Sequence, residues 1–231
     1  PSDVPMDLAD YSQELAVTDA ITILDHLKIK SAHIIGLSMG GFTAVHMGLE
    51  YPERCHSLCV AGCGYGAEKK YEEYFKGVSL EVAKNFEEKG AKEFSKIYSL
   101  GASRVQFQNK NPRGWEEFAQ RLAEHSSQGS ALTMRGVQAQ RPSLYDLEEE
   151  LKSMPVPTLI VNGDEDDHCL QVGLYLKKII PASGLLVLPK TGHTLNLEDP
   201  EVFNRALSEF LTLVSNEKWL PRDPRAKPEQ V

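Results

Sequence analysis

Two kinds of apolar pattern alternate along this chain. Unbroken apolar runs predict buried parallel strands at residues 34–37, 58–61, 158–161 and 185–188. Apolar residues spaced three or four positions apart predict amphipathic helices at residues 11–27, 42–50, 170–180 and 199–213. Because strands and helices alternate, the pattern predicts an α/β fold, a mostly parallel sheet with helices on both faces.

Residues 67–150 break this alternation, because strand-like runs vanish and apolar residues recur only at helical spacing. Asn111-Pro112 predicts one helix start within the stretch, as an N-cap followed by a first-turn proline. We expect a helical cap that excludes water from an active site, since the insertion is longer than an ordinary connection. The alternative is a helical insertion that packs on the outside of the core and does not cover the active site. The core then comprises residues 1–66 and 151–215, followed by a tail at 216–231 with Trp219 as a docking candidate.

The candidate chemistry starts where the first strand ends, at Gly36-Leu37-Ser38-Met39-Gly40. A G-x-S-x-G between a strand and a helix is typical of a nucleophile elbow, whose strained turn demands small residues two positions either side of the serine. The turn places the Ser38 hydroxyl at a helix N-terminus, which favours a developing anion, and the Met39 N–H is the expected oxyanion donor. We expect Gly41 to let helix and strand pack closely. The alternative is a glycine-rich strand-to-helix turn whose serine has no catalytic role.

Two later strand ends offer the base and the acid that a serine nucleophile needs. An acidic cluster at residues 164–167 follows the third strand, and Gly192-His193 follows the fourth. The chain order of serine, acid and histidine is the order of an α/β-hydrolase triad. The cluster by itself leaves Asp164, Asp166 and Asp167 open as the acid.

The stretch from Leu8 to Leu213 resembles the α/β-hydrolase superfamily, in its capped, esterase-like branch. The resemblance is carried by the elbow, by the strand and acidic loop at 156–166, and by Thr191-Gly192-His193 with residues 198–204 behind it. In the family pattern the acid stands three residues after the glycine of the loop, which is Asp166 here.

The resemblance implies that Ser38 is the nucleophile, His193 the base, Asp166 the orienting acid and Met39 an oxyanion donor. The expected function is a serine hydrolase that cleaves a small carboxylic ester through an acyl-enzyme. An enol-lactonase or a carbon–carbon bond hydrolase of the same fold is an alternative, as is a non-catalytic ligand-binding member. Haloalkane dehalogenases and epoxide hydrolases of this fold use aspartate at the position of Ser38, which argues against both. No metal or organic cofactor is implied.

Charge and cysteine content limit partners and location. The net charge of −8 and the pI of about 5.4 argue against nucleic acid or an anionic membrane as partner. The partner that the family resemblance implies is a small ester or lactone. No apolar run is long enough to span a membrane. Four cysteines without C-x-x-C spacing predict reduced thiols and a cytoplasmic location, although a signal peptide ahead of residue 1 is not excluded: Cys55, Cys59, Cys63 and Cys169.

The start of the chain departs from the family pattern. That pattern begins with further strands and with a His-Gly segment that supplies a second oxyanion donor, whereas this chain opens at Pro1 just before the helix at 11–27. We therefore expect an exposed strand edge beside residues 34–37, which favours self-association. We also expect that extra N-terminal residues or another chain complete the enzyme.

Overall fold

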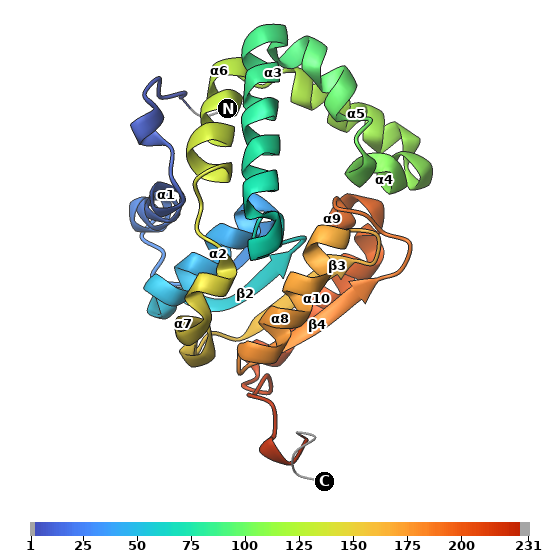
Figure 1. Ribbon diagram of the computed structural model, residues 1–231. Coiled ribbons are helices and arrows are strands. Elements are labelled where there is room, and N and C mark those ends of the chain that lie inside the picture. The colour runs from blue at the N-terminus through green and yellow to red at the C-terminus, as the bar shows by residue number, and fades with distance from the viewer. Residues whose placement is uncertain (1–2, 227–231) are drawn as a thin grey trace.

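A parallel four-stranded sheet forms the centre of the computed structural model, which describes residues 3–226 (Figure 1). The strands lie in the order β1-β2-β3-β4, and every neighbouring pair is parallel. Each predicted strand is present, and each begins earlier or ends later than its apolar run. Their bounds are Ala32–Leu37 for β1, Cys55–Ala61 for β2, Thr158–Gly163 for β3 and Ser183–Leu188 for β4.

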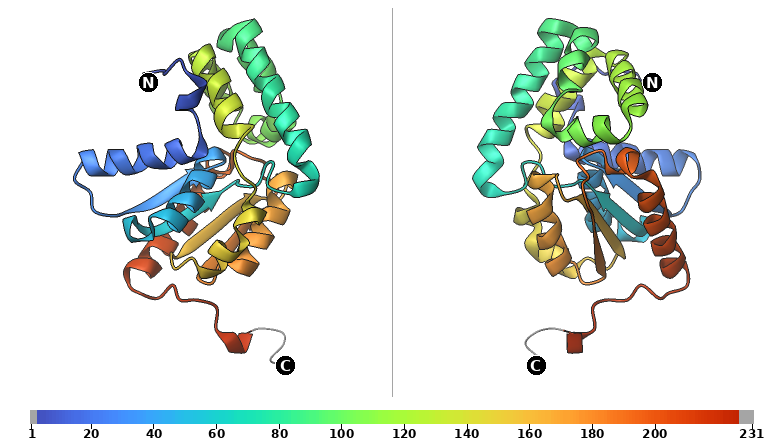
Figure 2. Two further views of the ribbon diagram at one scale, coloured as in Figure 1. Left: turned by 60° about the vertical axis from the view of Figure 1, so that its left-hand side comes forward. Right: turned by 90° about the vertical axis from the view of Figure 1, so that its right-hand side faces the viewer.

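Helices cover both faces of this sheet, which confirms the predicted α/β class (Figure 2). The helices α1 (Gln13–His26), α2 (Met39–Glu50), α7 (Glu148–Ser153) and α8 (Asp167–Ile179) pack on one face. On the other face, α9 (Leu195–Glu198) and α10 (Pro200–Ser215) contribute Leu195, Phe203 and Phe210 to a second apolar cluster. These two clusters are the core that holds the strand ends in place.

Helical spacing predicts that Leu27 and Val202 face inward on the helices expected at 11–27 and 199–213, but both residues lie at the surface. Leu27 is 58% exposed because α1 ends at His26 and Leu27 is only its C-cap. Val202 is exposed on α10, whereas Phe203, the next residue, is buried against the sheet. Helical spacing places a residue on a face, but the helix end and the packing partner decide whether that face is covered.

The insertion between β2 and β3 is helical throughout its regular structure, as the sequence predicts. Its main helices, here called the cap helices, lie together at one end of the sheet (Figures 1 and 2): α3 (Glu72–Tyr98), α4 (Val105–Lys110), α5 (Pro112–Ala123) and α6 (Ser127–Thr133). They enclose a small apolar core of their own that includes Phe86, Phe94 and Leu122. The predicted start of α5 is confirmed, because Asn111 Oδ1 accepts a hydrogen bond of 2.9 Å from the Gly114 amide.

Short helical turns complete the chain. They are η1 (Leu8–Asp10), η2 (Pro52–Arg54), η3 (Lys69–Tyr71), η4 (Ala102–Arg104), a π-helical turn η5 (Met134–Gln138), η6 (Leu144–Leu147) and η7 (Pro224–Ala226). The division into core and cap at residues 67 and 150 stays a prediction. Pro1, Ser2 and residues 227–231 of the predicted tail lie outside the described residues.

The first strand is an edge of the sheet. Within residues 3–226, β1 pairs with β2 alone, so the expected exposed edge is present. The expectation that this run is buried is wrong at Ile35, which is 50% exposed. At the opposite end of the sheet, Trp219 docks as expected: its ring lies 4.6 Å from that of Phe210 and its Nε1 donates to the Ala182 carbonyl at 2.9 Å.

None of the four cysteines takes part in a disulfide, and all four are buried, in agreement with the expectation of reduced thiols. Among the described residues, no helix combines the length and the apolar character that crossing a membrane requires.

Candidate active site

The turn between β1 and α2 holds Ser38 in a strained conformation. Its backbone has φ 55° and ψ −115°, a region that residues other than glycine rarely adopt. Met39 is the first residue of α2, and first-turn amides have no partner inside their own helix. The Met39 amide therefore stands beside the serine as a free donor at the positive end of a helix dipole.

The glycines around Ser38 are not equivalent. A Cβ on Gly36 would lie 2.0 Å from the Gly40 carbonyl oxygen, so the turn closes only with glycine at position 36. A Cβ on Gly40 would meet no atom within 4 Å, and the expected need for a small residue there is wrong. The expected close packing at Gly41 is confirmed, since a Cβ there would lie 2.9 Å from Cys63 Cβ.

A buried hydrogen bond joins two of the predicted triad residues. His193 Nδ1 lies 2.7 Å from a carboxylate oxygen of Asp166, and the two residues are 6% and 2% exposed. Asp166 stands between β3 and α8, and His193 follows β4. Because β3 and β4 are neighbouring parallel strands, both residues lie at the carboxyl ends of the strands, on the same side of the sheet. Because the carboxylate accepts at Nδ1, the neutral ring keeps its proton there and leaves Nε2 free to accept another.

The other aspartates of the loop serve different contacts. Asp164 accepts a hydrogen bond of 3.1 Å from the Thr191 amide, and Asp167 is exposed at the first position of α8. Burial acts to raise the pKa of Asp164, but hydrogen bonds from the Lys190 and Thr191 amides outweigh it and lower the pKa. Only Asp166 of the three reaches the His193 ring.

Leu37 and His193 lie near each other across Gly62. A Cβ on Gly62 would be 3.3 Å from Leu37 Cδ1 and 3.4 Å from His193 Nδ1, so the ring stands beside the residue that precedes the serine. The hydrogen bonds of the described residues include none between Ser38 and His193. A hydrogen bond between a nucleophile and its general base is often long before substrate binds.

Glu198 holds the loop that carries His193, a role that the sequence analysis did not assign. Its buried carboxylate accepts from the Gly192 amide at 2.6 Å, and from the Thr194 amide and hydroxyl at 2.9 and 2.8 Å. The residues on both sides of His193 are thereby tied to one carboxylate. The available signal was its position five residues after the histidine, within the segment that carries the family resemblance.

Tyr65 is a second residue that sequence reasoning missed. Its ring packs edge-on against His193 with centroids 5.1 Å apart. Burial raises the pKa of its hydroxyl, Asp166 adds to this, and the positive charge of Arg104 opposes it. Tyr65 is therefore a neutral neighbour of the imidazole. Its signal was a place in the loop after the second strand, where α/β sheets bind ligands.

One group of three potential metal ligands occurs within residues 3–226, formed by Asp166, Cys169 and His193 with ligand atoms within 4.8 Å of one another. Burial raises the pKa of the Cys169 thiol well above its usual value, and Asp166 adds to this, so the thiol keeps its proton. His193 Nδ1 and the Asp166 carboxylate are also already engaged with each other, in a hydrogen bond of 2.7 Å. The group therefore fits acid–base chemistry better than metal binding.

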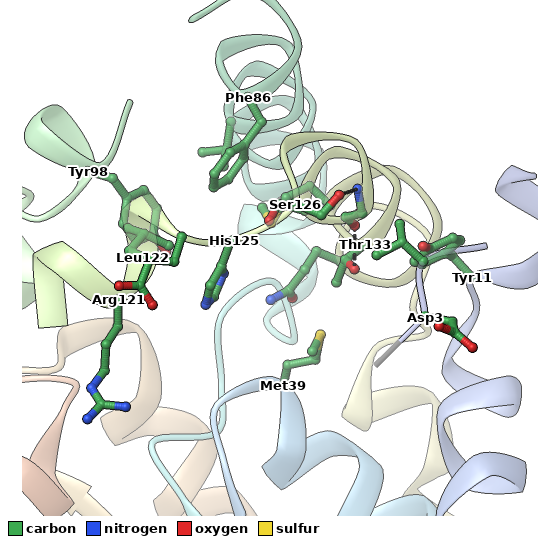
Figure 3. A pocket seen from close by; sticks show the side chains of 17 residues that line it. Asp3, Tyr11, Met39, Phe86, Tyr98, Arg121, Leu122, His125, Ser126 and Thr133 are labelled. Carbon is green, nitrogen blue, oxygen red and sulfur yellow. Dashed lines mark hydrogen bonds between the residues drawn. The ribbon is translucent and has the colours of Figure 1, made fainter. Parts of the chain in front are cut away.

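A cavity of about 910 Å³ lies between the elbow and the cap helices. Met39 lines its floor, while Phe86, Tyr98 and Leu122 approach from the cap helices (Figure 3). Asp3 and Tyr11 lie on the opposite side of the cavity in the same view. The N-terminus of α2, at Met39, thus opens on a space large enough for a small organic substrate.

A family model, described as the alpha/beta hydrolase fold, matches residues 1–200. The chain belongs to this family. Among curated proteins, the hydrolase is 27% identical over 218 residues to a putative 2-succinyl-6-hydroxy-2,4-cyclohexadiene-1-carboxylate synthase of Bacillus subtilis, a match that covers 92% of this chain and 77% of that protein. It is 30% identical over 196 residues to 3-oxoadipate enol-lactonase 1 of Acinetobacter baylyi, with 84% and 68% covered.

The fold of the hydrolase is also similar to that of a solved structure, MenH from S. aureus. The TM-score is 0.80 at 24% sequence identity, and the match covers 89% of this chain and 77% of the other. At this identity the likeness shows the fold alone.

Proposed function

We propose that the hydrolase cleaves small carboxylic esters, with Ser38 as nucleophile, His193 as general base and acid, and Asp166 as the orienting carboxylate. The observation that carries the proposal is the buried 2.7 Å hydrogen bond between Asp166 and His193, beside a serine held at φ 55° at the start of a helix. These are the parts of a nucleophile–base–acid relay.

In the acylation half of the reaction, Ser38 Oγ attacks the ester carbonyl carbon while His193 Nε2 takes the hydroxyl proton. The tetrahedral intermediate carries its charge on the former carbonyl oxygen, which the Met39 amide stabilises. As the intermediate collapses, the bond to the alcohol breaks and His193 returns the proton to the leaving oxygen. Asp166 stabilises the imidazolium form of His193 between these two proton transfers.

In the deacylation half, a water molecule attacks the acyl group on Ser38. His193 takes a proton from the water and then delivers it to Ser38 Oγ as the acid leaves. The cycle consumes one water and one ester and releases one acid and one alcohol.

A second candidate is an enol-lactone, which the relative named 3-oxoadipate enol-lactonase 1 favours. An enol-lactone is a cyclic ester, so Ser38 would open it by the same attack. The leaving enol stays attached to the acyl group, and the cavity over the elbow must then hold the whole product until water attacks.

The test is turnover of a panel of p-nitrophenyl esters and lactones by the native protein and by Ser38→Ala. The substitution should lower kcat by a factor on the order of 10⁶, because the nucleophile of the unit is gone. Ser208→Ala, an exposed serine on α10, is the matched control and should leave kcat unchanged. A fluorophosphonate should label Ser38 of the native protein. Absence of labelling, together with unaltered turnover by Ser38→Ala, would overturn the proposal.

A further inference from the structure

The cap contains a buried positive charge with no acidic partner. Arg104, at the end of η4, is 8% exposed and belongs to none of the ion pairs formed by the described residues. Its Nη1 donates to the carbonyl and hydroxyl oxygens of Ser103 at 3.3 and 2.9 Å. Its Nε is buried and has no hydrogen-bond partner. Burial of an uncompensated charge is costly, so such a group calls for a negative partner.

Aromatic rings hold the guanidinium of Arg104 in place. Its central carbon lies 5.6 Å from the ring centroid of Tyr98 and 5.4 Å from that of Phe118. These cation–π contacts compensate part of the buried charge and fix the plane of the group. With Nη1 bound to Ser103, the Nε and Nη2 edge is the side on which two parallel hydrogen bonds to a carboxylate can form.

Arg104 also lies close to the loop that carries His193 and to the cavity. The Ser103 carbonyl accepts a hydrogen bond of 3.4 Å from the His193 amide, and the Arg104 charge acts on Tyr65, whose ring packs on His193. Tyr98, which contacts the guanidinium, lines the 910 Å³ cavity (Figure 3). The positive charge is therefore placed behind one wall of the space that opens onto the elbow.

We propose that Arg104 binds a carboxylate on the substrate, remote from the scissile carbonyl, so that the hydrolase acts on monoesters or lactones of dicarboxylic acids. The proposal rests on the proposed function, because it names the substrate class of that same site. Tyr98 contacts the guanidinium and lines the cavity, so the proposal requires its ring to turn aside as the acid binds, while Phe118 keeps its contact with Arg104. The carboxylate then completes the ion pair that the free protein lacks.

The test compares two p-nitrophenyl esters of equal chain length, the monoester of glutaric acid and the pentanoate. The native protein should favour the glutarate monoester in kcat/KM, and Arg104→Met should reduce this preference by about 10- to 100-fold, the loss expected for hydrogen bonds to a charged group. Arg104→Lys should restore part of it. Arg113→Met, an exposed arginine on α5, should leave the preference unchanged.

Calorimetric binding of glutarate to Ser38→Ala reports on Arg104 without any turnover. Binding that Arg104→Met abolishes supports the proposal, even if Ser38 proves inert and the proposed function fails. Equal turnover of both esters by the native protein, or glutarate binding that persists in Arg104→Met, overturns the proposal and leaves the serine chemistry intact. Circular dichroism of each variant identifies any loss of fold, and Arg104→Lys provides the folded comparison.

Discussion

At the scale of single residues, three aspartates within four positions of one loop have three different surroundings. Asp164 accepts a backbone amide, Asp167 faces solvent at a helix start, and Asp166 is buried against His193. Their local sequence distinguishes them poorly, because each is an acidic residue between a strand and a helix. The distinction comes from the loop after β4, whose residues 191 and 193 contact Asp164 and Asp166 respectively.

Asp166→Asn should lower kcat by about 10⁴-fold, because an amide at this position favours the wrong tautomer of His193. Asp164→Asn serves as the matched control in the same loop, and it should cost far less. The measurement is steady-state turnover of the best ester from the panel. If Asp164→Asn instead caused the larger loss of kcat, the assignment of Asp166 as the orienting acid would be wrong.

At the scale of elements, the elbow is a contact between a strand end and the first turn of a helix. Its geometry depends on Gly36, where any side chain would collide with the Gly40 carbonyl, and on the positive φ of Ser38. The G-x-S-x-G pattern alone suggests that both glycines serve the turn equally. The structure separates them, because position 40 faces open space.

Gly36→Ala should lower the free energy of unfolding by about 3 kcal/mol, at the upper end of the usual cost of overpacking. Gly40→Ala should be neutral or stabilising, because alanine is the better helix former and meets no neighbour. Urea unfolding monitored by circular dichroism measures both. Similar destabilisation by the two substitutions would contradict this account of the turn.

The pairing of β1 with β2 carries a pH-sensitive contact. His33 Nδ1 lies 2.7 Å from Ser57 Oγ, and its ring lies 5.2 Å from that of His56. Burial lowers the pKa of His33, and the neighbouring His56 lowers it further. In the unfolded chain His33 has the ordinary histidine pKa of about 6.5. As the pH falls through this value, the unfolded chain therefore binds the proton more readily than the folded chain does.

It follows that the contribution of His33 to stability is full at neutral pH and declines as the pH falls through 6.5 toward the lower folded value. Urea unfolding at about pH 7.5 and pH 5.5 should show a loss that is smaller in His33→Gln than in the native protein. His26→Gln, at the exposed end of α1, is the control and should retain the native pH dependence. An unchanged dependence in His33→Gln would refute the contribution.

At the scale of the whole molecule, the two edges of the sheet differ. Trp219 and Arg222 contact the chain just before β4, through the Ala182 and Pro181 carbonyls. The outer side of β1 has no strand partner among residues 3–226, and Ile35 of this strand is half exposed. An open apolar edge of this kind favours pairing with another strand.

Residues 3–226 should therefore self-associate through β1 in a concentration-dependent manner, which sedimentation velocity measures. Ile35→Lys should shift the distribution toward monomer, because a charge on an edge strand opposes pairing. Val187→Lys, at an exposed position of β4 on the opposite edge, should leave it unchanged. A purely monomeric native chain, or an equal response to both substitutions, would count against association at this edge.

By itself, the sequence determined the four strands, the helices around them, the helical insertion and the position of the elbow. These features follow from apolar periodicity and turn chemistry, which depend on residues a few positions apart. The motifs at the strand ends pointed to Ser38 and His193, and the resemblance to the family then singled out Asp166. Only the tertiary structure decided which contacts these residues make, because it brings together the ends of β1, β3 and β4 from distant parts of the chain.

The same reason explains what the sequence did not reveal. The hydrogen bonds from the His193 loop to Glu198, the open space at Gly40 and the exposure of Ile35 all depend on what residues distant in sequence do, or do not, place beside them within residues 3–226. The burial of Arg104, without an acidic partner among residues 3–226, likewise depends on the packing of the cap helices around it. Periodicity records which face a residue occupies, whereas only the folded chain determines what meets that face.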